Sequence, residues 1–289
     1  MPITEGRITA NDVDFAYFEA GSGPLALCLH GFPDSAWTWR HLLPALADAG
    51  FHAVAPFLRG YAPSSVPADG RYQTAALGLD ANALHEQLGG DGSAVLVGHD
   101  WGAMATYVAG NHEPDRWRRL VTMAVPPAGA VASGFLTYQQ LRKSWYMFFF
   151  QHGLSDIVVG MNDLSFIDSL WADWSPGYDG AVDVSHVREA IRDPERTAAA
   201  IGYYRAMLQP DRNGPTYAAQ QAAAALTSPK PYLYLHGTQD GALGAPTEEA
   251  VLANLAPGSR AEIIDGVGHF LQLEKPDVVN DLVIEWLTT

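Results

Sequence analysis

Short, mostly apolar runs recur along the chain, each bounded by polar, glycine or proline positions. Such runs are typical of parallel strands that are buried on both faces of a sheet. They lie at 25–29, 52–55, 94–97, 120–125, 232–235 and 261–264. The opening segment differs, because Val13, Phe15 and Tyr17 alternate with other residues after an Asn11-Asp12 turn signal. That pattern predicts an antiparallel hairpin with one face toward solvent.

Helical periodicity fills the intervals between the apolar runs. In the segment 77–88, apolar residues recur at helical spacing before Gly89-Gly90, a glycine pair that favours the end of a helix. A last helix is predicted from Pro276 onward, because proline is favoured at the first helical position. Strands that alternate with helices indicate an α/β fold with a mostly parallel, doubly wound sheet.

The alternation stops for about a hundred residues in the middle of the chain. Helical patterns rich in aromatic residues and alanine appear there, without a convincing strand. Prolines at 126–127 and 229–231 are natural hinges at the two edges of this segment. We therefore expect an α/β core formed by residues 1–125 and 227–289, with an inserted helical cap at 126–226.

The composition is that of an ordinary folded protein, with 48% hydrophobic and 17% charged residues in 289 positions. The 32 acidic residues outnumber the 17 basic ones and give a formal net charge of −15. Such a charge repels phosphate groups, so nucleic acids and anionic membranes are not expected partners.

Cys28 is the one cysteine of the chain and cannot form an intrachain disulfide. The segment after Met1 lacks a basic stretch followed by an apolar one, and no apolar run approaches the roughly 18 residues of a membrane span. We therefore expect a cytoplasmic protein without a signal peptide or a membrane anchor. A homo-oligomer is compatible with the sequence.

The strongest chemical signal is the segment Gly98–Gly102, which reads GHDWG and separates the run at 94–97 from a helix expected near Ala103. A tight strand-to-helix turn holds its central residue in a strained, exposed conformation, and flanking glycines relieve the crowding. The central residue is Asp100, which disfavours serine-esterase chemistry. The alternative is an aspartate that only caps the helix, and the flanking glycines argue against it. We predict that Asp100 is a nucleophile.

Two further titratable residues follow predicted strands near the end of the chain. Asp240 lies after the run at 232–235, and His269 lies after the run at 261–264. Because the carboxyl ends of parallel strands form the ligand-binding edge of a doubly wound sheet, we expect both residues there. The chain order Asp100, Asp240, His269 matches the order nucleophile, acid, histidine of a catalytic triad.

The other histidines at strand ends give no reason to expect a metal ion. His30, His99 and His236 follow or end apolar runs, but their spacing is not that of metal ligands. We therefore predict no metal and no cofactor.

Together these motifs resemble the α/β-hydrolase superfamily, specifically the branch that holds epoxide hydrolases and haloalkane dehalogenases. The resemblance covers nearly the whole chain. In that branch a His-Gly-x-Pro loop follows an early strand, and residues 30–33 read His-Gly-Phe-Pro. Alone, this loop would indicate only a turn. Beside the Asp100 motif, it implies an oxyanion hole formed by the backbone amides of Phe32 and Trp101.

An aspartate nucleophile suits attack on an alkyl carbon, because a carboxylate is already ionised at neutral pH. The product of that attack is an ester of Asp100. His269, oriented by Asp240, is then expected to activate a water molecule against the ester. The Phe32 and Trp101 amides would stabilise the oxyanion that forms.

The leaving group separates epoxide chemistry from haloalkane chemistry. Epoxide opening produces an alkoxide that needs a proton donor, whereas a halide leaves unprotonated. Epoxide hydrolases use two cap tyrosines as donors. The resemblance implies Tyr146, five residues before Gln151, as the first and Tyr204 as the second.

The second tyrosine is the weaker match. Gly202 stands where the family usually has asparagine, so Tyr203 stays open as a rival. Helical spacing favours Tyr204, which shares a face with Ile201 and Leu208. Aromatic packing is the alternative role for either tyrosine, and the joint occurrence of two matching positions favours proton donation.

We therefore predict an epoxide hydrolase that converts a hydrophobic epoxide and water into a vicinal diol, as in detoxification. The aromatic residues of the predicted cap indicate an apolar pocket. One alternative is a haloalkane dehalogenase with the same nucleophile, against which Phe32 argues because its side chain offers a halide no donor. Another is a non-catalytic ligand-binding protein, against which the complete set of predicted residues argues.

Overall fold

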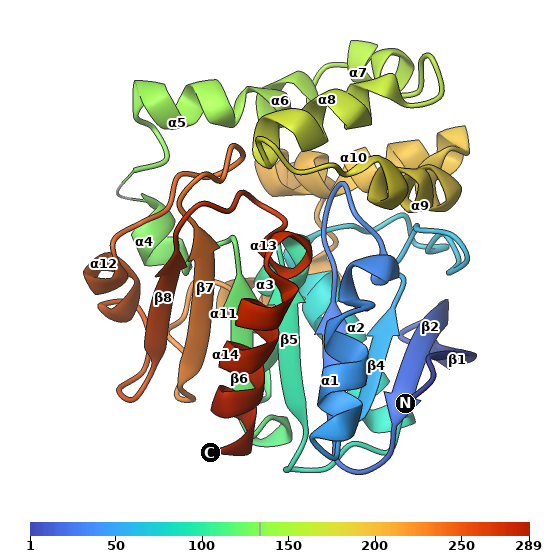
Figure 1. Ribbon diagram of the computed structural model, residues 1–289. Coiled ribbons are helices and arrows are strands. Elements are labelled where there is room, and N and C mark those ends of the chain that lie inside the picture. Colours follow the sequence, from blue (N-terminus) through green and yellow to red (C-terminus); the bar gives the residue numbers. More distant parts are fainter. Residues whose placement is uncertain (133) are drawn as a thin grey trace.

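The computed structural model describes residues 1–132 and 134–289, and its centre is an eight-stranded sheet (Figure 1). The strand order is β1-β2-β4-β3-β5-β6-β7-β8. β2 pairs antiparallel with β1 and β4, and the other neighbours pair in parallel. The strands are β1 (Thr4–Ala10), β2 (Val13–Gly21), β3 (Leu25–Leu29), β4 (His52–Pro56), β5 (Val95–His99), β6 (Arg119–Met123), β7 (Tyr232–Gly237) and β8 (Arg260–Ile264). This is the mostly parallel, doubly wound sheet that the sequence predicts.

Each predicted parallel run forms a strand, with small differences at the ends. The main difference is in β6, which ends at Met123, whereas the apolar run continues to Val125. Ala124 has a φ of 64°, so the backbone leaves the extended conformation directly after the strand. The amide of Ala124 still donates to the carbonyl oxygen of Leu235 at 3.0 Å.

The predicted hairpin forms, but its buried face is not the simple alternation expected. Asn11 and Asp12 both have positive φ values, 45° and 58°, as a tight hairpin turn requires. Val13 and Phe15 are buried as predicted, whereas Tyr17 is half-buried and its neighbours Ala16 and Phe18 are buried. From Phe15 onward the alternation is inverted, because Ala16, Phe18 and Ala20 are buried whereas Tyr17 and Glu19 are half-buried; α1 packs on this strand.

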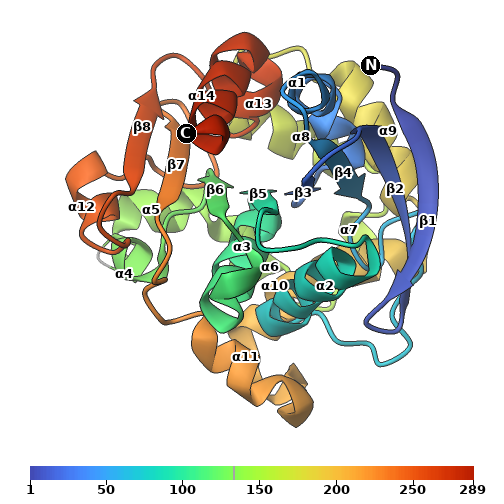
Figure 2. The same cartoon turned by 90° about the horizontal axis from the view of Figure 1, so that it is seen from below.

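Helices cover both faces of the sheet. Seen from below, α1 and α14 lie on one face, and α2, α3 and α11 lie on the other (Figure 2). The predicted helix ends are confirmed at two places, because α2 stops before Gly89, which has a φ of 72°, and α14 begins at Pro276. These helices, with the shorter elements between strands, are α1 (Leu42–Asp48), α2 (Thr74–Gln87), α3 (Trp101–His112), α4 (Ala128–Ala132), α11 (Ala218–Ala223), α12 (Glu248–Leu252), α13 (Leu271–Glu274), α14 (Pro276–Thr288), η1 (Ala36–Trp39), η2 (Pro114–Arg116), η3 (Pro210–Arg212) and η4 (Pro215–Tyr217).

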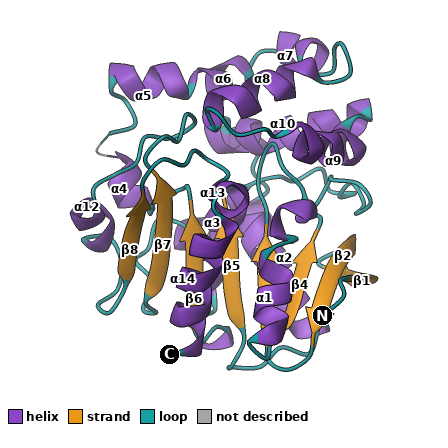
Figure 3. Ribbon diagram, viewed as in Figure 1, coloured by secondary structure: helices purple, strands orange, loops and turns teal. Residues whose placement is uncertain are grey.

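Six consecutive helices between β6 and β7 form a separate layer over the carboxyl ends of the strands (Figures 1 and 3). We call α5 to α10 the helical layer. Its members are α5 (Tyr138–Lys143), α6 (Trp145–Phe149), α7 (Leu154–Val158), α8 (Ser165–Trp174), α9 (Ala181–Ile191) and α10 (Pro194–Leu208). α11, which ends the insertion between the two strands, packs instead on α2 and α3.

The helical layer is attached to the loop that follows β3. Arg40 Nη1 lies 2.5 Å from Asp183 Oδ1 of α9, and this carboxylate is buried. The Trp171 indole donates to the carbonyl oxygen of Pro33 at 2.7 Å. The rings of Trp37 and His186 stack with centroids 4.3 Å apart. These contacts hold the helices above the edge of the sheet where the predicted site residues lie.

Candidate active site

Asp100 occupies a sharp turn between β5 and α3. β5 ends at His99 and α3 begins at Trp101, so the aspartate is the single residue of the connection. Its φ of 53° and ψ of −116° lie outside the conformations that non-glycine residues usually adopt. The amide of Asp100 donates to the carbonyl oxygen of Met123 at 3.1 Å, which ties the turn to the end of β6. This strained geometry is that of a nucleophile elbow.

Three glycines make this turn sterically feasible. A Cβ atom on Gly98 would lie 2.1 Å from the carbonyl oxygen of Gly102, and one on Gly102 would lie 2.0 Å from that of Leu29. A Cβ on Gly31 would lie 2.2 Å from Asp100 Oδ1 itself. Real atoms do not approach so closely, so side chains at these positions would displace the backbone around Asp100.

The carboxylate of Asp100 is buried and held by backbone amides. The Phe32 amide donates to Asp100 Oδ1 at 2.7 Å. Burial raises the pKa of Asp100 to about 6, although the charge of His269 and the amides of Phe32 and Trp101 act in the opposite direction. At neutral pH the group is therefore mainly a carboxylate, poorly solvated, with Oδ1 bonded to the Phe32 amide, one of the two predicted oxyanion-hole donors.

Asp240 and His269 form a buried hydrogen-bonded pair next to Asp100. His269 Nδ1 lies 2.9 Å from Asp240 Oδ2, and the other oxygen, Oδ1, accepts from the amides of Ala242 and Leu243 at 2.7 and 2.9 Å. Burial alone would raise the pKa of Asp240. The charge of His269 and the hydrogen bonds that the Asp240 carboxylate receives from side chains outweigh burial, so they hold the pKa of Asp240 well below its usual range. Asp240 is thus a permanent anion that fixes the His269 ring.

The second nitrogen of His269 faces the Asp100 carboxylate. His269 Nε2 lies 3.8 Å from Asp100 Oδ2 and, among the described residues, has no hydrogen-bond partner, although it is buried. Burial lowers the pKa of His269, but the charge and hydrogen bond of Asp240 and the charge of Asp100 overcome this effect, so the pKa is raised overall. At 3.8 Å the two atoms are too far apart for a direct hydrogen bond.

Asp100 lies in the wall of an apolar cavity of about 510 Å³. Trp101, Tyr146 and Tyr204 line the same cavity. Among the described residues that line it, Asp100 is the only one with a charged side chain. Most of the others are apolar, including Met104, Phe135, Met147, Met207, Leu208 and Leu243. The arrangement favours an uncharged, hydrophobic ligand next to a single carboxylate.

The two predicted tyrosines come from different helices and meet at this cavity. Tyr146 of α6 and Tyr204 of α10 are both buried, and their rings contact at 5.5 Å between centroids. Burial, and then the nearby charge of Asp100, raise the pKa of Tyr146 well above 10, and burial, Tyr146 and Asp100 do so for Tyr204. Both phenols therefore keep their protons at neutral pH. No hydrogen-bond partner of the buried Tyr204 hydroxyl is found within residues 1–132 and 134–289.

Tyr203, the rival of Tyr204, points to another part of the fold. Its hydroxyl donates to the carbonyl oxygen of Arg59 at 2.7 Å. The Arg59 side chain in turn forms a buried ion pair with Asp80. Tyr203 does not appear among the residues that line the cavity. Both rings contact the indole of Trp101, with centroids 5.0 Å apart for Tyr204 and 5.5 Å apart for Tyr203, but only Tyr204 lines the cavity among the described residues.

The other strand-end histidines have structural partners. His30 Nδ1 contacts the carbonyl oxygen of Gly31 at 2.9 Å, and His30 Nε2 accepts from the Leu58 amide at 3.0 Å. His99 Nε2 contacts the carbonyl oxygen of His269 at 2.9 Å. No group of three or more metal-ligating side chains occurs within residues 1–132 and 134–289.

One residue beside the predicted site had no predicted role. His236, four positions before Asp240, places its Nε2 atom 3.1 Å from Asp240 Oδ2. The sequence feature that could have pointed to His236 is its position at the end of an apolar run, just before Gly237. Its contact with Asp240 depends on the turn that follows β7, which the sequence pattern does not reveal.

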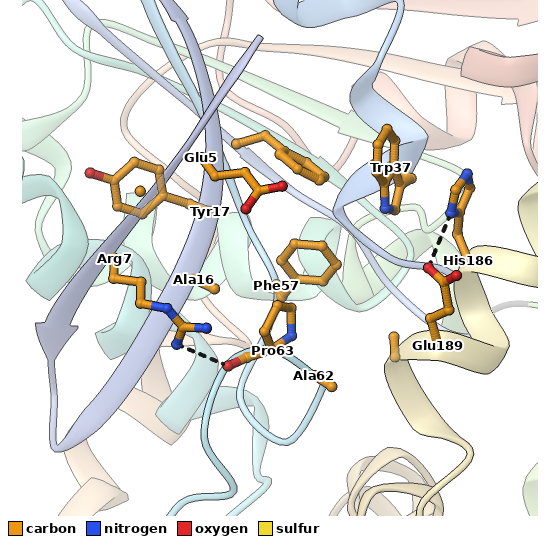
Figure 4. Close-up of a pocket in the computed structure, with 13 residues that line it drawn as sticks. Glu5, Arg7, Ala16, Tyr17, Trp37, Phe57, Ala62, Pro63, His186 and Glu189 are labelled. Atoms are coloured by element: carbon orange, nitrogen blue, oxygen red, sulfur yellow. Dashed lines mark hydrogen bonds and ion pairs between the residues drawn. The ribbon is translucent and has the colours of Figure 1, made fainter.

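A second hollow, of about 630 Å³, lies beside β1, β2 and α9 and is remote from this chemistry (Figure 4). None of the predicted site residues lines it. Three of its polar side chains have local partners, because Arg7 Nη1 donates to the carbonyl oxygen of Pro63 at 3.3 Å and His186 lies 3.5 Å from Glu189. The cavity at Asp100 is therefore the candidate active site.

Comparison with known proteins identifies what the chain is similar to. The model of the α/β-hydrolase fold family matches residues 24–276. The chain is 30% identical to epoxide hydrolase A of Mycobacterium tuberculosis, over 99% of the chain and 97% of that protein. It is 31% identical to an epoxide hydrolase of Caballeronia sordidicola, over 99% of the chain and 94% of that protein.

Solved structures give the same result. Epoxide hydrolase A of Mycobacterium thermoresistibile superposes with a TM-score of 0.81 and 28% identity, covering 99% of the chain and 98% of that structure. A Bacillus megaterium epoxide hydrolase bound to an inhibitor superposes with a TM-score of 0.82 and 26% identity, covering 98% of the chain and all of that structure. Within residues 1–132 and 134–289, no helix has the length and apolar character needed to cross a membrane.

Proposed function

The chain belongs to the α/β-hydrolase family, in the branch of the epoxide hydrolases, and we propose that it opens a hydrophobic epoxide through a covalent ester on Asp100. The observation that carries this proposal is the composition of one cavity wall. A carboxylate, Asp100, and two protonated phenols, Tyr146 and Tyr204, line the same apolar space. A strained three-membered ring needs both a nucleophile and an acid, and these groups supply them.

In the first step Asp100 Oδ2 attacks an epoxide carbon and breaks its bond to the ring oxygen. Asp100 Oδ1 is already occupied by the Phe32 amide at 2.7 Å, so Oδ2 is the oxygen with free lone pairs toward the cavity. The developing alkoxide takes a proton from Tyr146 or Tyr204. The products of this step are a hydroxyalkyl ester of Asp100 and a tyrosinate.

In the second step His269 Nε2 takes a proton from a water molecule, which attacks Cγ of Asp100. The tetrahedral oxyanion forms where the Phe32 and Trp101 amides donate. Its collapse breaks the bond to the diol oxygen, which takes the proton held by His269, and the Asp100 carboxylic acid that remains gives its proton to the tyrosinate. Asp240, a buried anion bonded to His269 Nδ1, stabilises the imidazolium that exists during this step.

The lining of the cavity supports a hydrophobic substrate, and the helical layer supplies both phenols from above the strand ends. We propose that this layer acts as the cap of the enzyme and excludes water during the first step. The alternative of haloalkane chemistry has less support. Among the described lining side chains, Trp101 alone offers a halide an indole N–H, whereas the two phenols suit protonation of an alkoxide. The buried Cys28 agrees with a reducing compartment such as the cytoplasm.

The decisive experiment separates the two steps with the variant H269Q. Alkylation needs no base, so an ester should still form, whereas its hydrolysis should slow by about 10² to 10⁴-fold. Intact-protein mass spectrometry after mixing with an aryl epoxide should show an adduct of the substrate mass, mapped to the peptide that contains Asp100. The matched control H152Q changes an exposed histidine of the helical layer and should turn over without an adduct.

A single turnover of the unmodified enzyme in ¹⁸O-water provides an independent test. The new diol oxygen should come from Asp100 and be mostly unlabelled, while the carboxylate acquires the label. Fully labelled diol, together with no adduct in H269Q, would show that water attacks the epoxide directly. Turnover of brominated alkanes but of no epoxide would replace the proposed substrate class.

A further inference from the structure

A second histidine contacts the acid of the candidate triad. His236, the penultimate residue of β7, is fully buried, and its Nε2 atom lies 3.1 Å from Asp240 Oδ2. The same oxygen is 2.9 Å from His269 Nδ1. Asp240 Oδ2 therefore lies between two imidazole rings, one of which belongs to the predicted base.

The surroundings of His236 determine where its proton resides. Nε2 also lies 3.2 Å from the carbonyl oxygen of Leu243, so two acceptor oxygens face this nitrogen. On the other side of the ring, the Tyr234 hydroxyl contacts Nδ1. A lone pair on Nε2 would repel both oxygens, so the stable tautomer carries its proton on Nε2 and accepts the Tyr234 proton at Nδ1.

The result is a chain of hydrogen-bonding groups that ends on the triad. Tyr234 donates to His236, whose Nε2–H is shared between the Leu243 carbonyl and Asp240 Oδ2. With the amides of Ala242 and Leu243 on Oδ1, both carboxylate oxygens of Asp240 face at least two donors. Each donor withdraws negative charge from the side that faces His269.

We propose that His236 is a positioning residue for the hydrolysis step. It orients the Asp240 carboxylate and withdraws negative charge from it, so that His269 stays neutral and can accept a proton from water. This inference rests on the proposed role of His269 as the base. It gives a function to the buried hydrogen-bonded chain from Tyr234 through His236 to Asp240, which the roles of the three triad residues do not explain.

The charges around His269 explain why such a donor to Asp240 is needed. Its ring faces the carboxylates of Asp240, Asp100 and Asp34, which favour the imidazolium, and the ring of His99. Their combined effect exceeds the effect of burial and raises the pKa of His269. A base that is already protonated cannot accept a proton, so a donor that weakens the pull of Asp240 preserves activity at neutral pH.

The other groups on this part of the site do not replace that donor. The Lys143 ammonium contacts the backbone carbonyl of Asp240, not its carboxylate. Tyr234 reaches the carboxylate only through His236. His236 is therefore the one side chain besides His269 for which the described structure gives a contact with the Asp240 carboxylate.

The test uses H236L, which replaces the imidazole by an apolar side chain of similar length and so removes the donor. The pKa of His269, followed by NMR titration of its Cε1–H signal, should rise by about one pH unit. Hydrolysis of the Asp100 ester in single-turnover experiments should slow by about tenfold at pH 7 and recover in part at higher pH. Alkylation should stay within about twofold of the unmodified enzyme, because it does not use His269.

Two further variants separate positioning from packing. Y234F keeps both rings but removes the proton that fixes the His236 tautomer, and it should shift the His269 pKa in the same direction by a smaller amount. H236Q can place an amide N–H near the position of Nε2 and should restore much of the ester hydrolysis. If H236L does not fold, Y234F and H236Q carry the test.

An unchanged His269 pKa in both H236L and Y234F would overturn the inference, as would equal slowing of alkylation and hydrolysis at every pH. Either result would assign His236 a purely structural role. The NMR titration requires no turnover, so it tests the inference even if epoxides are not the substrate. A missing ester in H269Q, together with fully labelled diol from the unmodified enzyme, would instead count against the proposed function.

Discussion

The sheet edge and the helical layer hold their site residues by different means. At the sheet edge, Asp100, Asp240 and His269 are fixed by hydrogen bonds of 2.7 to 2.9 Å to amides or to each other. In the helical layer, Tyr146 and Tyr204 are fixed by ring contacts with buried aromatic neighbours. Charged groups need partners when they are buried, whereas a protonated phenol can be held by its ring alone and keep its hydroxyl for the substrate.

The backbone shows the same division. Asp100 has a positive φ, and glycines crowd around it at Gly31, Gly98 and Gly102. Tyr146 and Tyr204 lie inside regular helices, where no unusual backbone conformation is required. The position of Asp100, the proposed nucleophile, thus depends on strain held by the sheet, while the positions of Tyr146 and Tyr204, the proposed proton donors, depend on how two helices pack above it.

The largest expected change in the alkylation rate comes from removing both phenol hydroxyls, and it tests whether the helical layer supplies the proton donors. We expect Y146F or Y204F to slow alkylation by about 10² to 10⁴-fold, and the double variant to slow it further, because the alkoxide loses its donor. Stopped-flow tryptophan fluorescence, which can report through Trp101, measures this step. The exposed Tyr138 of α5 gives the matched control Y138F, which should behave as the unmodified enzyme. Undiminished alkylation in the double variant would remove the phenols from the mechanism.

The next effect concerns the buried nucleophile and pH. Asp100 attacks as a carboxylate, so its activity is present above its pKa and is lost as pH falls through it. Because burial raises that pKa to about 6, alkylation should fall about tenfold for each pH unit below about 6. The phenols keep their protons over this range and should not contribute. A single-turnover profile that stays flat down to pH 4 would contradict the electrostatic consequence of burial.

The smallest effect concerns the attachment of the helical layer. R40M removes the partner of the buried Asp183 carboxylate while keeping the stem of the side chain. We expect it to lower the free energy of unfolding by about 1–3 kcal/mol, because Asp183 keeps only the hydroxyl of Tyr178. Chemical denaturation measures this change, and R142M, at an exposed arginine of α5, is the control. A loss of alkylation as large as that of the tyrosine variants would mean that attachment, not the phenols, limits the reaction.

Local sequence patterns were sufficient for the sheet and for the elbow. Apolar runs, glycine pairs and prolines are local signals, and they placed the parallel strands, the end of α2 and the start of α14 within a few residues. They failed where the surroundings decide burial, as at Tyr17 and Phe18 of β2, because the strands and helices that cover a strand are set by the fold. Ala124 shortened β6 for a similar reason, since its positive φ follows from the turn and not from its residue type.

The sequence by itself was enough to predict the groups that we propose for the chemistry, because residue type and chain order can be read without a fold: a carboxylate at Asp100, an imidazole at His269 and phenols at Tyr146 and Tyr204. Only the tertiary structure decided their geometry. It separates Tyr204, which lines the cavity, from Tyr203, which bonds to the Arg59 carbonyl, and it brings His236 against Asp240. Such contacts join segments that are far apart in the chain or depend on the exact path of a turn, and no local pattern encodes a distance between them.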